Sequence, residues 1–145
     1  TELENATGEE LRKTGNEFGA TTGRPRRCGW IDLVALNFAC MINGVTKIVM
    51  TKADVLDAFK ELQVCTDYTI HGKTGREIPF QLDRDKPVPV FKSFPGWHTD
   101  TSKIKTYDHL PETTRNYVSF INDYLGVKIL YISNGPGRDQ IVEVK

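Results

Sequence analysis

The sequence predicts a single domain of mixed α/β class, and three observations lead to this prediction. The 145 residues are about the length of one domain and can bury a core without disulfides or metal. Segments with helical spacing of apolar residues alternate along the chain with short strands rich in β-branched residues. No repeat, low-complexity tract or linker divides the sequence, so residues 1–145 are expected to fold together.

The first half of the chain predicts two helices and a strand. Residues 1–18 are polar and charged and lack an initiator methionine, which we expect of a cut end. The run IDLVALNFACMIN over 31–43 is apolar at most positions and precedes Gly44, which predicts a largely buried helix ended by a glycine. TKIVM over 46–50 predicts a strand. Residues 55–62 repeat apolar side chains at helical spacing and predict the second helix.

The second half predicts mainly strands around one helix. Residues 64–70 and 76–80 predict a hairpin closed by the turn HGKTG, whose glycines can take positive φ. PVPVF over 87–91 predicts another extended segment, and 111–125 predicts an amphipathic helix that tolerates its proline in the first turn. The remaining elements are a strand over 127–132, a tight loop over 133–137 and a last strand over 140–144.

Composition limits the classes of partner. The chain has 19 basic and 19 acidic residues and a net charge of +0, which argues against a general nucleic-acid or membrane-surface binder. The cysteines Cys28, Cys40 and Cys65 are odd in number and widely spaced, which favours a reduced, cytoplasmic protein. No apolar run is long enough to span a bilayer, so no membrane association is expected.

The stretch TTGRPRRCGW over 21–30 concentrates basic residues. Pro25 disfavours helical backbone at Arg24, and in an extended segment Arg24 and Arg26 project to one side while Arg27 projects to the other. Two guanidinium groups on one side suit a carboxylate or a phosphate, and the preceding threonines and glycine can add hydroxyls and a close N–H. A solvated basic loop is an equally good interpretation of these residues alone.

The segment TKAD over 51–54 lies where a strand ends and a helix is expected, the usual ligand crevice of α/β sheets. Its pattern T-K-x-D resembles the guanine-reading element of GTP-binding proteins, in which a carboxylate accepts from N1–H and the exocyclic amine. In that interpretation Asp54 reads the base and the aliphatic stem of Lys52 lies along the ring. The alternative is that Asp54 caps the following helix, and a pattern of only four residues favours this alternative.

Other local patterns carry less chemistry. The SNGPG loop over 133–137 can present backbone groups to a base edge or simply join two strands, and it matters only if it folds beside TKAD. Gly72-Lys73-Thr74 has the ending of a phosphate loop but lacks the first glycine, since position 67 is Asp67. The three histidines show no metal spacing and no paired nucleophile, so no metal site is expected, and Trp97 is expected to pack within its loop.

Four segments together resemble the adenylosuccinate synthetase family. The run GNEFGATTGRPRRCGWID over 15–32 is similar to the family's signature. TKADVLD over 51–57, FPGW over 94–97 and ISNGP over 132–136 follow in the family's order. The resemblance therefore covers nearly the whole chain.

This resemblance implies a fold and an activity. Residues 1–145 would be the C-terminal, substrate- and guanine-binding domain, with a mixed sheet, of a larger P-loop-like GTP-dependent ligase that joins IMP and L-aspartate into adenylosuccinate. The phosphate loop, the Mg²⁺ ligands and the catalytic aspartate and histidine of the family belong to an N-terminal part, so no catalytic residue is expected here. The full-length enzyme would be a cytoplasmic homodimer. A freestanding guanine-nucleotide binding module is the alternative, and a basic-loop nucleic-acid binder is disfavoured by the charge.

The resemblance also implies binding residues. Pro25 departs from the family, in which a basic residue is common at this position. The residues implied for L-aspartate and IMP are Ala20, Thr21, Thr22, Gly23, Arg24 and Arg26. The residues implied for GTP are Arg26, Lys52, Ala53, Asp54, Ser133, Asn134 and Gly135.

Overall fold

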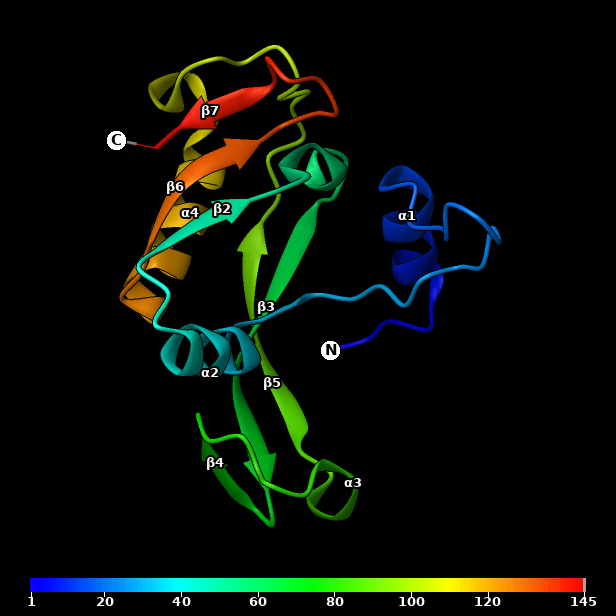
Figure 1. The fold of residues 1–145 in the computed structure, drawn as a ribbon, viewed down its shortest axis with the longest axis vertical. Coiled ribbons are helices and arrows are strands. Elements are labelled where there is room, and N and C mark those ends of the chain that lie inside the picture. Colours follow the sequence, from blue (N-terminus) through cyan, green and yellow to red (C-terminus); the bar gives the residue numbers. More distant parts are fainter. Residues whose placement is uncertain (145) are drawn as a thin grey trace.

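The computed structural model describes residues 1–144 and contains two β-sheets (Figure 1), between which the larger of two hydrophobic clusters lies. This arrangement confirms the predicted mixed α/β class. The elements in chain order are α1 (Ala6–Thr14), β1 (Ile31–Asp32), α2 (Leu33–Asn43), β2 (Lys47–Met50), the 3-10 helix η1 (Ala53–Leu56), β3 (Glu61–Ile70), β4 (Lys73–Gly75), α3 (Leu82–Asp85), β5 (Val88–Pro95), the 3-10 helix η2 (Tyr107–His109), α4 (Glu112–Leu125), β6 (Lys128–Ser133) and β7 (Ile141–Glu143).

The first sheet has the order β2-β6-β7, and it confirms three predicted strands. β2 and β6 run parallel although 77 residues separate the end of one from the start of the other (51–127). β6 and β7 are antiparallel and are joined by the SNGPG loop. Ile129, Ile132 and Val142 of these strands are almost completely buried, as expected for a sheet with one face on a core.

The second sheet is built around the long strand β3, which pairs antiparallel with both β4 and β5 and parallel with the short β1. In Figure 1, β3 and β5 form an extended ribbon that reaches from the core to the projecting β4 and α3. The pairing of β3 with β5 runs from Glu61 opposite Pro95 to Thr69 opposite Val88. The predicted extended segment 87–91 is therefore confirmed and is longer than expected.

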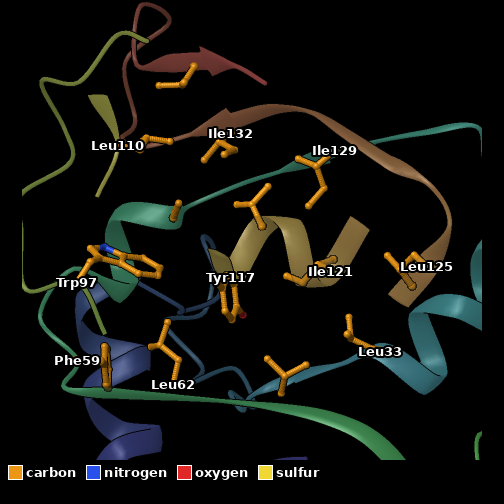
Figure 2. Close-up of a cluster of buried hydrophobic side chains, with 14 of the residues drawn as sticks. Leu33, Phe59, Leu62, Trp97, Leu110, Tyr117, Ile121, Leu125, Ile129 and Ile132 are labelled. Atoms are coloured by element: carbon orange, nitrogen blue, oxygen red, sulfur yellow. The ribbon is translucent and has the colours of Figure 1, made fainter. Parts of the chain in front are cut away.

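The core lies where α4 packs between the two sheets. Figure 2 shows Tyr117, Ile121 and Leu125 of α4 converging with side chains of β6 and with Leu62 of β3. The predicted helix over 111–125 is confirmed with Pro111 at its N-cap position, and Gly126 ends it with a left-handed backbone at φ 63. The expected packing of Trp97 is also confirmed, because it is 6% exposed and lies in this core.

The predicted helix over 55–62 is wrong. Only Ala53–Leu56 form a short 3-10 helix, and the chain then turns into β3 at Glu61. Leu62 and Val64 are completely buried on alternate positions of that strand, so their environment follows a strand period. Tertiary partners override the local pattern here: Gly96 donates its N–H to the Lys60 carbonyl at 2.8 Å, which joins this turn to the end of β5.

The predicted hairpin is correct in its first strand and wrong in its second. β3 ends at Ile70 and β4 begins at Lys73, so the turn contains only His71 and Gly72. Both turn residues have positive φ, 49 and 78, as a two-residue hairpin requires. Residues 76–80 are not a strand in the structure.

Two helices differ from expectation. α2 forms as predicted and ends at Gly44, but Met41 and Ile42 are 68% and 62% exposed, so the helix is only partly buried. α1 lies within the polar residues 1–18, where no helix was predicted. Its signals were the Asn5 side chain, which caps the helix by accepting from the Gly8 N–H at 3.1 Å, and the basic residues of its last turn.

Gly96 of the FPGW segment leads to a stability prediction. A Cβ atom at this position would lie 1.7 Å from the Phe59 carbonyl oxygen, so Gly96→Ala must displace backbone. We expect a loss of about 3 kcal/mol in the free energy of unfolding, since overpacking against backbone cannot be relieved by a rotamer change. Denaturant unfolding followed by Trp97 fluorescence measures it. Gly75→Ala is the matched control, because nothing lies within 4 Å of its Cβ position, and equal losses would contradict the prediction.

Candidate functional site

Two of the predicted binding loops lie at the same edge of the β2-β6-β7 sheet. Met50 pairs with Ile132 in the parallel register, so the chain leaves β2 and β6 in the same direction. The TKAD segment (51–54) follows β2, the SNGPG loop (133–137) follows β6, and η1 contacts β6. The carboxyl ends of parallel strands form the usual ligand crevice of such sheets. The condition that made the SNGPG loop relevant is therefore met.

Asp54 provides an unused acceptor at this edge. Its Oδ1 atom is buried and accepts no hydrogen bond from any group in residues 1–144. Lys52 is the N-cap residue of η1, and no side chain caps that helix, so the alternative in which Asp54 is a helix cap is wrong. A buried acceptor without a donor costs about 1–3 kcal/mol, and a ligand N–H would recover this cost.

Lys52 connects this edge to the basic segment. Its backbone is left-handed, with φ 59, and its ammonium group donates to the Gly15 carbonyl at 2.7 Å and to Glu17. The other oxygen of Glu17 accepts from Arg26 Nη1 at 2.9 Å. Hydrogen bonds from Lys52 and then Arg26 hold the pKa of Glu17 below its ordinary value, so this carboxylate is ionised at neutral pH. One carboxylate thus holds two of the cations that the sequence assigned to ligands.

The basic segment forms a tight exposed loop. Gly19 donates its N–H to the Arg24 carbonyl at 2.8 Å, and Gly23 donates back to the Gly19 carbonyl at 2.8 Å. Gly23 has φ 65, a backbone conformation that a larger side chain disfavours. The loop is closed by the bridge between Phe18 and Pro25. It therefore presents residues 20–26 to solvent on a defined backbone.

The three arginines of this loop have different surroundings. Within residues 1–144 the guanidinium of Arg24 has no ion-pair partner, whereas Arg26 pairs with Glu17 and Arg27 pairs with Glu2. The Glu2 contact ties Arg27 to the start of the chain, which agrees with a structural role. The placement of Arg24 and Arg26 on one side stays a prediction.

The SNGPG loop is held from inside by Asn134. This side chain is completely buried, and its Nδ2 donates to the Ile104 carbonyl at 2.9 Å and to the Thr101 carbonyl. Ser133 Oγ donates to the Gly135 carbonyl at 3.0 Å, which closes the turn. The amide group of Asn134 therefore faces the protein, and the loop has its backbone to offer to a ligand.

A cavity of about 380 Å³ is lined by residues of the segment before β1 and of the segment after β2. Lys52 and Glu17 line it on the polar side, and Trp30, Val55 and Leu56 line it on the apolar side. Asp54 is not among its lining residues, so this cavity is not by itself a pocket for a base read by Asp54. It shows that the segments before β1 and after β2 border one hollow.

One group at the site was missed by the sequence interpretation. Asp57 accepts hydrogen bonds from Trp97 and Thr101, which places it between η1 and the loop after β5. The available signal was the second acidic residue of TKADVLD followed by the tryptophan of FPGW, which together suggest a buried carboxylate with an indole donor.

The discounted features have ordinary surroundings. Gly72-Lys73-Thr74 spans the hairpin turn and the start of β4. His109 Nδ1 is bonded to Thr106 Oγ1 at 2.8 Å, and His71 lies 3.5 Å from Asp85. Across residues 1–144, no three His, Cys, Asp or Glu side chains are grouped as metal ligands. No helix of this region is both long and apolar enough to cross a bilayer.

Comparison with known proteins assigns the family. The family model described as adenylosuccinate synthetase matches residues 1–142. The chain belongs to the adenylosuccinate synthetase family. The resemblance seen in the four sequence segments is thereby confirmed, and it extends over nearly all residues of the chain.

Individual adenylosuccinate synthetases are similar to this chain in sequence and in structure. The chain is 52% identical over 141 residues to the enzyme of Cytophaga hutchinsonii and 50% identical over 144 residues to that of Scheffersomyces stipitis. These alignments cover 97% and 99% of the chain but only 33% and 34% of the relatives. A structure of fully ligated adenylosuccinate synthetase from Plasmodium falciparum superposes with a TM-score of 0.95 at 36% identity, covering 100% of this chain and 35% of that one. The chain thus spans about a third of the length of its relatives.

Proposed function

We propose that this chain is the C-terminal part of an adenylosuccinate synthetase, the part that holds L-aspartate and recognises the guanine of GTP. The observation that carries the proposal is the buried, unpartnered Oδ1 of Asp54 at the edge where the TKAD segment meets the SNGPG loop. Membership of the family supplies the reaction, in which GTP, IMP and L-aspartate yield adenylosuccinate, GDP and phosphate.

Guanine recognition follows from the donors of the base. Guanine presents N1–H and an exocyclic amine side by side, and an ionised carboxylate can accept from both. In this proposal Asp54 accepts these donors, Lys52 and Ala53 border the base, and Ser133, Asn134 and Gly135 complete the pocket through the loop backbone. Adenine has an acceptor at N1 and would leave the carboxylate unpaired, which disfavours ATP.

The loop over residues 20–26 is proposed to bind the dicarboxylate substrate. Thr22, Arg24 and Arg26 would meet the carboxylates of L-aspartate, Arg24 would also reach the IMP ribose, and Arg26 would lie near the GTP phosphates. The lack of an ion-pair partner for Arg24 within residues 1–144 and the exposed position of the loop support this role. Ala20, Thr21 and Gly23 would shape the closing backbone.

The chemistry needs groups beyond this chain. In the family reaction O6 of IMP attacks the γ-phosphate of GTP, GDP leaves, and the amine of L-aspartate then displaces phosphate from C6. A base, Mg²⁺ and a phosphate cradle promote the first step. The family resemblance implies Mg²⁺ ligands in the remaining two thirds of the enzyme, and within residues 1–144 no three His, Cys, Asp or Glu side chains are grouped as metal ligands. This chain would position substrates.

An activity assay tests the proposal. A cytoplasmic, homodimeric full-length enzyme carrying this chain is expected to form adenylosuccinate only when GTP, IMP, L-aspartate and Mg²⁺ are all present. The isolated chain is expected to form none. The proposal is contradicted if the full-length enzyme fails to make adenylosuccinate or if the isolated chain turns over steadily.

A further inference from the structure

Asp57 lies three residues after Asp54, and both oxygens of its partly buried carboxylate accept hydrogen bonds. Its Oδ1 accepts from Trp97 Nε1 at 2.7 Å and from Thr101 Oγ1 at 3.0 Å. Its Oδ2 accepts from the Thr101 backbone N–H at 2.8 Å. Both oxygens of Asp57 therefore accept hydrogen bonds, whereas Oδ1 of Asp54 has no partner within residues 1–144. The two acidic residues of TKADVLD thus have different surroundings.

Thr101 also contacts the SNGPG loop and so connects that loop to Asp57. Thr101 is 1% exposed, and its carbonyl accepts from the Nδ2 of Asn134, whose side chain is completely buried. The same Nδ2 donates to the Ile104 carbonyl, so the segment 101–104 is fixed at both ends. A continuous chain of hydrogen bonds thus runs from Asp57 through Thr101 to Asn134.

A second set of contacts runs parallel to the first. Gln140, at the far end of the loop that joins β6 and β7, donates from Nε2 to the Ser102 carbonyl at 3.1 Å and accepts from the Gly137 N–H at 2.7 Å. Lys105 donates to the carbonyl of Asp139 at 2.6 Å. The segment 101–105 is consequently bound to Asn134 of the SNGPG loop and to Asp139 and Gln140, which follow that loop.

We infer that Asp57 is a positioning residue for guanine recognition, which fixes the SNGPG loop relative to Asp54 through Thr101 and Asn134. The inference rests on the proposed guanine site and adds residues to which that site assigned no role. Neither Asp57 nor Thr101 needs to touch the nucleotide. They set the separation between the carboxylate that reads the base and the loop backbone that faces it.

The chemistry of the network argues for more than packing. Burial raises the pKa of Asp57, while the hydrogen bonds from Thr101 and Trp97 act against that shift. Removing a carboxylate from water, even partly, costs free energy, so burial alone does not account for Asp57 at this position. What a carboxylate adds is geometry, because its two oxygens fix an indole N–H, a backbone N–H and a hydroxyl at once.

Loosening this network should affect GTP and leave the other substrates unaffected. A displacement of the SNGPG loop weakens contacts to the base, so we expect the KM for GTP to rise roughly tenfold in Asp57→Asn, the equivalent of one net hydrogen bond. The side-chain amide of this variant has an N–H donor where Asp57 has an acceptor, so it faces a donor of Thr101 or Trp97 and loses that hydrogen bond. The KM for IMP, the KM for L-aspartate and kcat at saturating GTP are expected to stay within about threefold.

Variants of Thr101 separate the network from general damage to the fold. Thr101→Val removes the hydroxyl at constant shape and is expected to raise the KM for GTP, and Thr101→Ser, which keeps the hydroxyl, is expected to restore it. Asp32→Asn is the matched control in the full-length enzyme. Asp32 also binds two donors, Ala35 N–H at 3.0 Å and Tyr68 O–H at 2.6 Å, but away from the two loops.

The outcomes are distinct. A rise confined to the KM for GTP in Asp57→Asn and Thr101→Val, absent in Thr101→Ser and Asp32→Asn, supports the inference. Unchanged GTP kinetics in Asp57→Asn and Thr101→Val, equal changes for all three substrates in these variants, or the same rise in the KM for GTP in Asp32→Asn overturn it. If Asp57→Asn does not fold, the Thr101 pair decides alone. Asp54→Asn is measured alongside: if it too leaves GTP selectivity intact, the guanine site itself is misplaced and the proposed function fails with it.

Discussion

Replacing Asp54 with asparagine in a full-length enzyme that carries this chain is expected to reverse its nucleotide preference from GTP to xanthosine triphosphate. The Oδ1 atom of this carboxylate is buried and unpartnered within residues 1–144, and the donors of guanine can satisfy it. An amide would face those donors with its own N–H. Xanthine has a carbonyl in place of the exocyclic amine and can accept from that N–H.

The expected size of this effect follows from hydrogen bonds to a charged group. Such bonds contribute about 1.5–3 kcal/mol each, so kcat/KM for GTP should fall by roughly 100-fold. Steady-state kinetics with both nucleotides measure the ratio. Asp123→Asn, which changes an exposed carboxylate on α4, is the control and should leave the ratio as it is. An unchanged GTP preference in Asp54→Asn would sink the assignment of Asp54.

Leucine at position 24 or 26 is expected to impair the use of L-aspartate. Each arginine is proposed to hold a carboxylate of this substrate, and the loss of a charge-assisted pair should raise the KM for L-aspartate by roughly 10- to 100-fold. Arg26→Leu should also raise the KM for GTP, because Arg26 is proposed to lie near the phosphates. In the structure Nη1 of Arg26 donates to Glu17, so a substrate carboxylate would compete with Glu17 or use the other nitrogens of the guanidinium group.

Arg27→Leu is the matched control for these variants. Arg27 directly follows this loop but pairs with Glu2, so its loss should reduce stability and leave the KM for L-aspartate almost unchanged. Initial rates at varied L-aspartate with saturating GTP and IMP give the three values. An equal KM for L-aspartate in Arg24→Leu, Arg26→Leu and the parent enzyme would show that the loop has another role.

Local sequence patterns were sufficient where an element depends on its own residues. β2, β6 and β7 follow from short runs rich in β-branched residues, and α4 follows from an apolar face that ends at Gly126. α1 was missed because its buried residues are only Gly8 and Leu11, which leaves almost no apolar period to detect. The expected burial of α2 was overestimated because composition alone does not reveal which of its faces has a neighbour.

The sequence by itself determined the class of the fold, most strands, α4 and the four segments that identify the family, because these depend on short-range periodicity and on rare local motifs. The tertiary structure alone decided how those segments meet. Parallel pairing of β2 with β6 brings two loops about 80 residues apart to one edge, and Asp57 gains partners 40 and 44 residues away. Helical spacing at 55–62 gave way for the same reason: partners that lie outside any local window contribute more free energy than the intrinsic preference of eight residues.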